Sequence, residues 1–373
     1  MDRNLNTNRI AIQPADFSHL ERMFKKALSR NQHCTNVIIQ LLRRRMPIHF
    51  GGMSDPFQPI ERSLKVSLKT LNLLQKYHYP TIISTKSALL IERRYLKILE
   101  DMDNLAVQIT LISSSEQATQ KLEPNAPSVE KRLELFAKLS EHDIWTSCRM
   151  QPLIPKVNDE DYELIDKLAA AGCEHVIVEH YKMPTYSSLN RRKMMNDACS
   201  YDIESYYRRS CSKPRGMFFE LPSSDKVVQL RKLVAHIHEK NMTFGAADND
   251  FHDLGDSTCC CGVDGLPGFQ NIHLRQNVKA VMDGKESGRI RYSSIENEWC
   301  SEGSVREIVN AHCRLQGCKD RFARSIRDFV ETKWNSPYSN NAPTDMANVV
   351  PSDEVDDSGH ITYKYSNKFT IKA

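Results

Sequence analysis

Between residues 15 and 180, short apolar runs alternate with longer amphipathic segments, and this alternation limits the fold more than any other feature of the sequence. The short runs are rich in β-branched residues, as buried strands are. The longer segments carry leucines three or four residues apart, as at Leu64, Leu68, Leu71 and Leu74, which places them on one face of a helix. Strands that alternate with helices form βα units with a parallel sheet.

This pattern predicts six strands, at residues 47–53, 81–87, 105–113, 144–155, 174–181 and 242–248. The chain is therefore expected to be an α/β protein built on a partial, TIM-like (β/α)6 barrel that occupies residues 1–248. Residues 249–334 are expected to form a Cys-rich and helical extension. Residues 335–373 are expected to be a loosely ordered tail, which ends in a strand within 360–371.

The net charge of +4 on 373 residues neither requires nor excludes a polyanionic partner. Basic clusters at 43–45, 191–193 and 208–209 are interpreted as solvated helix faces, with nucleic acid as the alternative partner. No run reaches the ~18 apolar residues of a membrane span, and the first residues lack the apolar core of a secretory signal. We therefore expect a cytoplasmic protein without membrane contact, whose eleven cysteines are free thiols or metal ligands.

Polar residues gather where the predicted strands end. The carboxyl ends of parallel strands meet at one edge of a barrel, and ligands bind there. Each residue also has a simpler explanation: a tight turn for the two glycines, an Asx turn for Asp55 before Pro56, and a solvated side chain for Lys86. Their convergence on one edge favours a binding site. The candidate residues are Gly51, Gly52, Met53, Ser54, Asp55, Lys86, Thr110 and Gln151.

Four stretches of the sequence together resemble a known family. SDPFQPIE, TIISTKSALLIERRYLKIL, LEPNAPSVEKRLELFAKLSEHDI and QPLIPKVND resemble, in order and spacing, the radical S-adenosylmethionine proteins of the spore photoproduct lyase-like group. The similarity extends over residues 8–181, about half of the chain. It implies a barrel with a [4Fe-4S] cluster that reductively cleaves S-adenosylmethionine to a 5′-deoxyadenosyl radical. It also implies an electron donor, such as flavodoxin or ferredoxin, as a partner.

The same resemblance implies roles for the candidate residues. The backbone of residues 51–53 corresponds to the stretch that receives the methionine amino group of the cofactor, and residues 54–55 follow on the same loop. Lys86 is similar to the lysine that reaches the carboxylate or ribose of the cofactor. Thr110 occupies the hydroxyl position of the next strand, and Gln151 lies where the following strand passes the adenosine.

The three cysteines that bind the cluster in this group, spaced C-x3-C-x2-C, are not found in the sequence. The segment NRIAIQPADFSHLERMFKKAL resembles the part just after the cluster loop, so the first barrel strand and that loop are expected to be missing. Three explanations are open: a fragment, a separate polypeptide that supplies the piece, or a non-catalytic relative. Because a cluster needs thiolate ligands, the chain as printed is not expected to catalyse radical chemistry. A cysteine motif encoded upstream would favour the enzyme.

The remaining cysteines and the substrate leave further alternatives open. Cys259, Cys260 and Cys261 are adjacent, and they are either buried thiols or part of a second metal site. Further candidate ligands are Cys199, Cys211, Cys300, Cys313 and Cys318. Gly52 stands where spore photoproduct lyase carries a hydrogen-donating cysteine, so repair of the thymine photoproduct is not expected, and the substrate is not predicted. The rival interpretations are a non-catalytic adaptor and a nucleic-acid-binding relative that keep the barrel as a scaffold.

Overall fold

The computed structural model describes residues 14–29, 36–210, 212–215, 217–248, 251, 254–269, 288–295, 326–339, 342–346 and 349–366. At its centre lies a sheet of six parallel strands in the order β1-β2-β3-β4-β5-β9. The strands are β1 (Ile48–Phe50), β2 (Thr81–Thr85), β3 (Leu105–Thr110), β4 (Thr146–Leu153), β5 (His175–His180) and β9 (Thr243–Ala246). Each lies within a predicted segment, so the α/β fold class with a partial barrel is confirmed.

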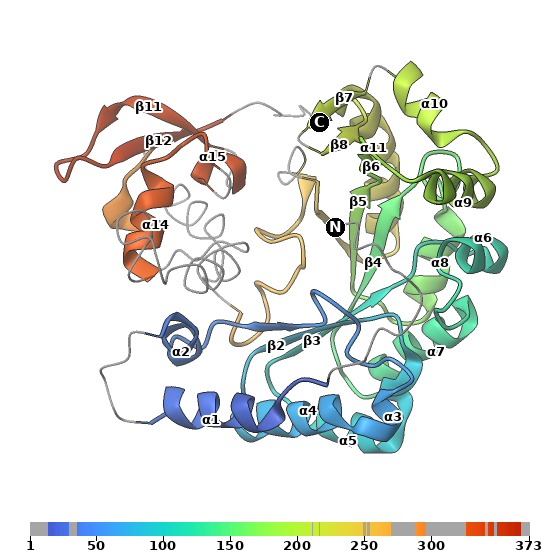
Figure 1. Ribbon diagram of the computed structural model, residues 1–373, viewed down its shortest axis with the longest axis horizontal. Helices are drawn as coiled ribbons and strands as arrows, with labels where there is room; N and C mark the ends of the chain where they lie inside the picture. Colours follow the sequence, from blue (N-terminus) through green and yellow to red (C-terminus); the bar gives the residue numbers. More distant parts are fainter. Residues whose placement is uncertain are drawn as a thin grey trace.

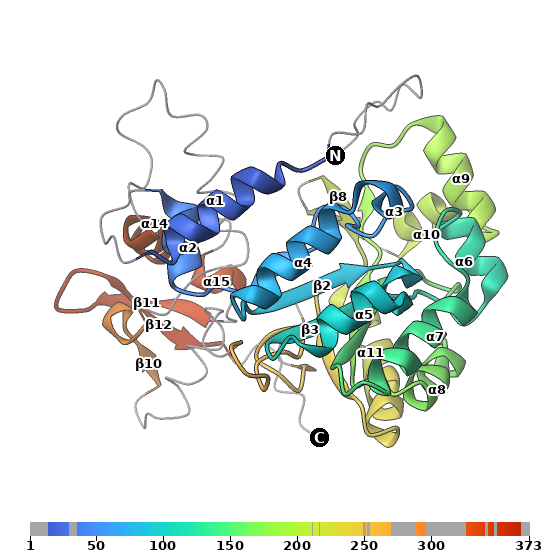
Figure 2. The same cartoon turned by 90° about the horizontal axis from the view of Figure 1, so that it is seen from below.

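Helices follow the strands and cover one face of the sheet, which we call the outer face (Figures 1 and 2). The helices that alternate with the strands are α3 (Glu61–Leu64), α4 (Val66–Lys76), α5 (Arg93–Glu100), α6 (Glu116–Leu122), α7 (Val129–Ser140), α8 (Tyr162–Ala170) and α11 (Ser223–Glu239). Two more, α1 (Phe17–Ala27) and α2 (Val37–Arg43), precede β1. None of the helices that the structure describes is both long enough and apolar enough to span a bilayer.

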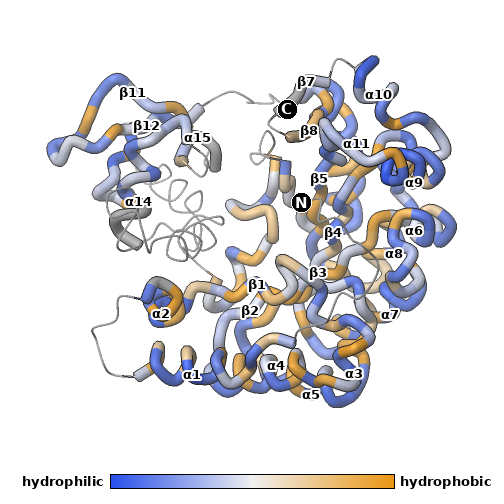
Figure 3. Tube along the Cα trace, in the orientation of Figure 1, coloured by the Kyte–Doolittle hydropathy of each residue, from blue (hydrophilic) through white to orange (hydrophobic). Residues whose placement is uncertain are grey.

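Successive side chains of a strand point to opposite faces of the sheet. On β3, Val107 and Ile109 face the helices, and on β4 Cys148 and Met150 do so; all four are fully buried in the main hydrophobic core. Each such side chain contributes roughly 1.5–3 kcal/mol when it is buried. Figure 3 shows hydrophobic segments around β2 and β3. The outer face is therefore held by apolar packing, and the alternate residues are left for the opposite, inner face.

The segment 254–269 covers the amino-terminal part of the inner face (Figure 1). Its residues Cys259, Val263 and Phe269 pack against Ile82 and Ala106 of the sheet in a second, smaller core. This segment approaches the sheet closely. A Cβ on Gly262 would lie 2.6 Å from the His175 ring, and a Cβ on Gly245 would lie 2.2 Å from the Cys260 carbonyl oxygen. Glycines at these two places are therefore required by packing.

Two small antiparallel sheets are not predicted by the sequence. One joins β6 (Met183–Pro184), β8 (Phe218–Glu220) and β7 (Lys213–Arg215) beside α9 (Leu189–Cys199) and α10 (Ile203–Arg209). The other joins β10 (Arg289–Ile290), β12 (Ile361–Tyr365) and β11 (Val349–Val355), together with α14 (Ile326–Trp334) and α15 (Pro343–Met346).

The second small sheet includes part of the predicted tail. Residues 349–366 are paired in a sheet, which differs from the loosely ordered tail expected for 335–373, and the strand expected within 360–371 is present as β12. The physical reason is an aromatic core. Trp334 is fully buried, and the centroid of its ring lies 4.8 Å from the ring centroid of Tyr363 and 5.6 Å from that of Tyr292. Much of the Cys-rich and helical extension expected at 249–334 lies outside the described residues.

A buried ionic cluster joins β5 and β9 to α11 on the outer face. Asp248 lies 2.6 Å from His180 Nδ1 and 3.5 Å from Lys226 Nζ, and it also accepts the His180 backbone N–H. Burial acts to raise the pKa of Asp248, but the hydrogen bonds from His180 and the charges of His180 and Lys226 outweigh it and lower the pKa from 3.8 to about 2. The carboxylate therefore stabilises the fold in its ionised form.

We predict that Asp248 makes the stability of the protein sensitive to acid. Because the pKa is lower in the folded than in the unfolded state, the contribution of about 2 kcal/mol is present above pH ~4 and is lost as the pH falls toward 2. Asp248→Asn should abolish this pH dependence and reduce the free energy of unfolding by about 3–5 kcal/mol, since it removes the carboxylate that pairs with the buried Lys226.

Urea unfolding followed by circular dichroism at several pH values measures both effects. Asp225→Asn, on the exposed first turn of α11, is the matched control and should change neither. Equal acid sensitivity in the Asp248→Asn variant and the unaltered protein would show that the cluster does not cause it.

Candidate functional site

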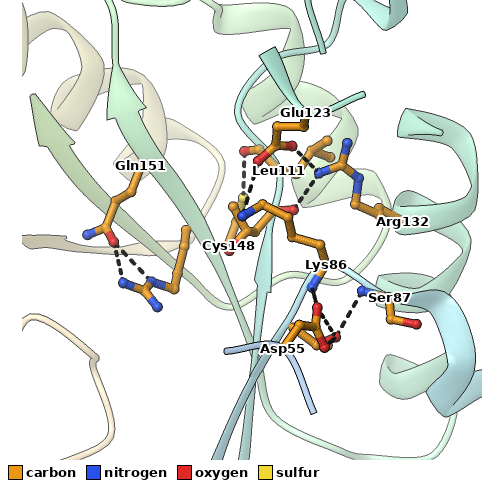
Figure 4. Close-up of polar contacts among 11 residues, drawn as sticks. Asp55, Lys86, Ser87, Leu111, Glu123, Arg132, Cys148 and Gln151 are labelled. Atoms are coloured by element: carbon orange, nitrogen blue, oxygen red, sulfur yellow. Dashed lines mark hydrogen bonds and ion pairs between the residues drawn. The ribbon is translucent and has the colours of Figure 1, made fainter. Parts of the chain in front are cut away.

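The predicted site residues lie at the carboxyl-terminal edge of the sheet, which we call the rim, and Figure 4 shows three of them, Asp55, Lys86 and Gln151. Asp55 comes from the loop after β1, and Lys86 directly follows β2. Thr110 is the last residue of β3, and Gln151 lies in β4. Because β1 to β4 are neighbours in the sheet, the rim brings together side chains that are up to 96 residues apart in sequence, from Asp55 to Gln151.

Asp55 fixes the loop after β1 to the end of β2. Its carboxylate accepts the Thr85 hydroxyl at 2.9 and 3.0 Å, the Lys86 backbone N–H at 2.7 Å and the Phe57 backbone N–H at 2.9 Å. The last of these bonds closes the Asx turn that the sequence offered as one explanation. The carboxylate therefore positions the rim, and it supports the neighbouring Lys86 through its backbone.

Of the two glycines that precede Asp55, Gly51 is required by the tight approach of this loop to β2. Gly51 has a φ of +110°, and a Cβ there would lie 2.1 Å from the carbonyl oxygen of Ser84. At Gly52 a Cβ would lie 3.3 Å from His49 Nδ1. Met53 follows with 78% of its surface exposed. The loop therefore presents bare backbone and an exposed thioether at the rim.

Lys86 belongs to an ion-pair network that the sequence does not reveal. Its Nζ lies 3.4 Å from Glu123 Oε1, and Glu123 Oε2 lies 2.6 Å from Nη1 of Arg132. The same Nη1 donates to the Thr110 carbonyl oxygen at 2.8 Å. Arg132 is fully buried, whereas 45% of the Lys86 side chain is exposed. Glu123 thus orients Lys86 at the surface and is held in turn by a buried arginine.

Gln151 lies beside a second cation of the rim. Its Oε1 accepts Nε and Nη2 of Arg149 at 2.9 and 2.6 Å. Arg149 is paired in register with Thr110 on the adjacent strand. Among the described residues, no carboxylate forms an ion pair with Arg149. The rim therefore contains two cationic side chains, Lys86 and Arg149, and is suited to an anionic ligand.

Reasoning from strand ends alone missed Glu123 and Arg132 as parts of the site. They lie nine residues apart, on either side of the turn between α6 and α7, so only the fold shows that they meet over β3. Arg149 lies two residues before Gln151 in the same predicted strand, so the pattern of strand ends already contained it, although it was not among the candidate residues.

The described residues contain no group of three or more His, Cys, Asp or Glu side chains arranged to hold a metal ion. Burial raises the pKa of the Cys259 thiol well above its ordinary value, and burial likewise raises the pKa of Cys199 to about 11. Cys211, Cys300, Cys313 and Cys318 lie outside the described residues, so a second metal site that includes them stays a prediction.

Comparisons with known proteins add relatives but no family match. No family model matches the chain. It is 28% identical over 115 residues to an uncharacterized protein of Methanocaldococcus jannaschii, which is 31% of this chain and 43% of that protein. It is also 27% identical over 133 residues to the radical SAM Nalpha-GlyT isomerase of Pseudomonas phage M6, which is 35% of this chain and 27% of the isomerase. The isomerase confirms the resemblance to radical S-adenosylmethionine proteins.

Two solved structures have a weaker likeness. A mutant of spore photoproduct lyase matches with a TM-score of 0.39 and 12% identity, over 60% of this chain and 62% of that chain. SuiB of Streptococcus suis matches with a TM-score of 0.41 and 14% identity, over 66% and 47%. The chain matches less than half the length of each curated relative, so their activities apply to it only as proposals.

We predict that the rim does not tolerate a side chain at Gly51. Gly51→Ala should reduce the free energy of unfolding by about 3 kcal/mol or more, because the added methyl group clashes with backbone and the φ is unfavourable. Gly265→Ala is the control, since a Cβ there meets nothing within 4 Å, and it should have little effect. Thermal unfolding of the two variants makes the comparison. Equal stability of the two would mean that the loop does not approach β2 as described.

Proposed function

We propose that the rim binds S-adenosylmethionine and that this chain is part of a radical S-adenosylmethionine protein. The observation that carries this proposal is the convergence of four neighbouring strands on one edge, where Asp55 holds the glycine loop at the end of β2 and where Lys86, Thr110 and Gln151 come from the end of β2, from β3 and from β4. The phage isomerase, whose name states its radical SAM class, supports it. A cytoplasmic location and the role of each rim residue are parts of the same proposal.

The chemistry of the rim fits the cofactor. S-adenosylmethionine carries an amino group, a carboxylate, a ribose and an adenine. The bare backbone at Gly51 and Gly52 allows close approach of the amino acid part. Lys86 is half-exposed and cationic, so it is suited to a carboxylate or to ribose hydroxyls, and the hydroxyl groups of Ser54 and Thr110 add donors and acceptors.

The iron-sulfur cluster is a different case. The described residues hold no set of three cysteines that fits a cluster. When bound in the intact protein, such a cluster would supply the electron that cleaves the cofactor, and a flavodoxin or ferredoxin would deliver it. The proposed function of this chain is therefore to hold and orient S-adenosylmethionine, with radical chemistry reserved for a protein that carries the ligands.

We predict that Lys86 contributes to cofactor affinity. Lys86→Ala should raise the Kd for S-adenosylmethionine about tenfold or more, because a charge-assisted contact is lost. The variant should remain folded, since Glu123 keeps its 2.6 Å bond to the buried Arg132. Isothermal titration calorimetry measures the affinity. Lys69→Ala, an exposed lysine on α4, is the matched control and should leave the Kd unchanged.

The outcomes separate the proposal from its rivals. No binding of S-adenosylmethionine to the unaltered chain, or equal affinity in the Lys86→Ala variant, would contradict the proposed rim site. Production of 5′-deoxyadenosine under anaerobic reduction distinguishes enzyme from adaptor. We expect it from a protein that carries the three-cysteine motif and not from this chain alone. A motif-bearing protein that binds the cofactor without cleaving it would favour the adaptor.

A further inference from the structure

A row of polar side chains crosses the middle of the inner face, in five neighbouring strands. Ser84 pairs in register with Gln108, Gln108 with Ser147, Ser147 with His175, and His175 with Thr243. These residues share the face that carries Ile82 and Ala106, opposite the helices. The row lies inside the sheet, below the strand ends where the rim is built.

The two ends of the row are satisfied by hydrogen bonds. His175 Nδ1 lies 2.8 Å from the Thr243 hydroxyl, and its Nε2 lies 2.9 Å from the Cys260 carbonyl oxygen. At the other end, His49 Nε2 lies 2.6 Å from Ser84 Oγ, which donates to Gln108 Oε1 at 3.0 Å. These bonds fix the row at both sides and leave its centre to be explained.

The centre of the row has two buried polar atoms without a partner among the described residues: Nε2 of Gln108 and Oγ of Ser147. Gln108 is 1% exposed and Ser147 is 0% exposed. A buried polar group without a hydrogen bond costs about 1–3 kcal/mol. The two atoms belong to directly paired residues of adjacent strands, whose backbones lie about 5 Å apart, and therefore point to a ligand or water as their common partner.

The free atoms favour a ligand that accepts hydrogen bonds. Because Gln108 Oε1 already accepts from Ser84, the amide is oriented with its NH2 group unused. Ser147 adds a hydroxyl that can also donate. Arg149 lies two residues further along β4 on the same face, and its side chain donates two hydrogen bonds to the neutral amide of Gln151. Two donors and a cation without a carboxylate partner among the described residues match an oxyanion.

We propose that the inner face of β3 and β4 binds a carboxylate of the substrate, with one oxygen held by Gln108 Nε2 and Ser147 Oγ and the charge balanced by Arg149. The identification of this ligand as the substrate rests on the proposed function, whereas the binding of a carboxylate does not. The substrate class is thus a small carboxylic acid or a molecule that presents a carboxylate side chain to the barrel interior.

The first test compares acids with their neutral amides. Succinate, N-acetylglycine and benzoate are added to the full chain at millimolar concentration, and succinamide, N-acetylglycinamide and benzamide serve as controls. At least one acid should raise the midpoint of thermal unfolding while its amide does not, because a bound ligand stabilises the folded state. The absence of an acid-specific shift in all three pairs would overturn the proposal.

The second test uses variants that a purely structural role would affect differently. Gln108→Leu and Ser147→Ala should each weaken binding of the acid about ten- to a hundredfold. Ser147→Ala should not destabilise the ligand-free protein, because it removes an unpaired polar atom. Gln108→Leu also breaks the hydrogen bond from Ser84, whose hydroxyl keeps its contact with His49, so a small loss of stability is expected. Thr146→Val is the matched control. Its buried hydroxyl also has no partner among the described residues, but it lies on the opposite face with Cys148, so acid affinity should not change. Unchanged affinity in Gln108→Leu, or an equal loss in Thr146→Val, would refute the assignment.

A third comparison separates this site from the rim. Lys86→Ala should retain acid binding, and Gln108→Leu should retain S-adenosylmethionine binding, so that either proposal can fail without the other. If S-adenosylmethionine instead competes with the acid and loses affinity in Gln108→Leu, the oxyanion is the carboxylate of the cofactor and the substrate assignment is overturned.

Discussion

The whole architecture depends on the alternation of side chains across a parallel sheet that has helices on one face only. Right-handed βα connections place every crossover helix on the same side, so residues such as Val107 and Ile109 must be apolar. The residues between them are free of that requirement. Gln108 lies between these two residues in β3, and parallel pairing aligns it with Ser84 on one side and Ser147 on the other. A polar row inside a buried sheet is thus compatible with a stable outer core.

The rim and the polar row form two levels of the same inner structure. Asp55 ties the glycine loop to the end of β2 through three hydrogen bonds, and a buried arginine holds Glu123 beside Lys86. At the lower level, the segment 254–269 closes the amino-terminal part of the inner face around His175. The groups proposed to bind ligands therefore lie on strands and on loops that are fixed by carboxylate side chains, an arrangement that reduces the entropy cost of binding.

The sequence predicted those features that depend on local periodicity. All six parallel strands lie within expected segments, and the rim residues lie at or beside the ends of β1 to β4 as parallel pairing requires. What could not be predicted depends on contacts between distant segments. The Asp248 cluster joins residues that are up to 68 positions apart, and the small sheet at 349–366 is held by the burial of Trp334. The role of Ser84, Gln108 and Ser147 became visible only when the register placed them in one row.

The pairing of Lys86 with Glu123 shows the same limit at the site. The lysine was predicted as a ligand from its position after a strand, but its orientation depends on α6 and α7, which no strand-end pattern describes. One of the simpler explanations for a single residue is also correct. The Asx turn at Asp55 exists, and it is the reason that the loop can serve as one wall of a binding site.

A crystal structure of the chain with S-adenosylmethionine tests the central claim most directly. We expect electron density for the cofactor on the rim, with its amino acid part against the Gly51 backbone and within reach of Lys86. Density at another place, such as the pocket lined by Tyr181, Arg192 and Glu204 beside α10, would contradict it.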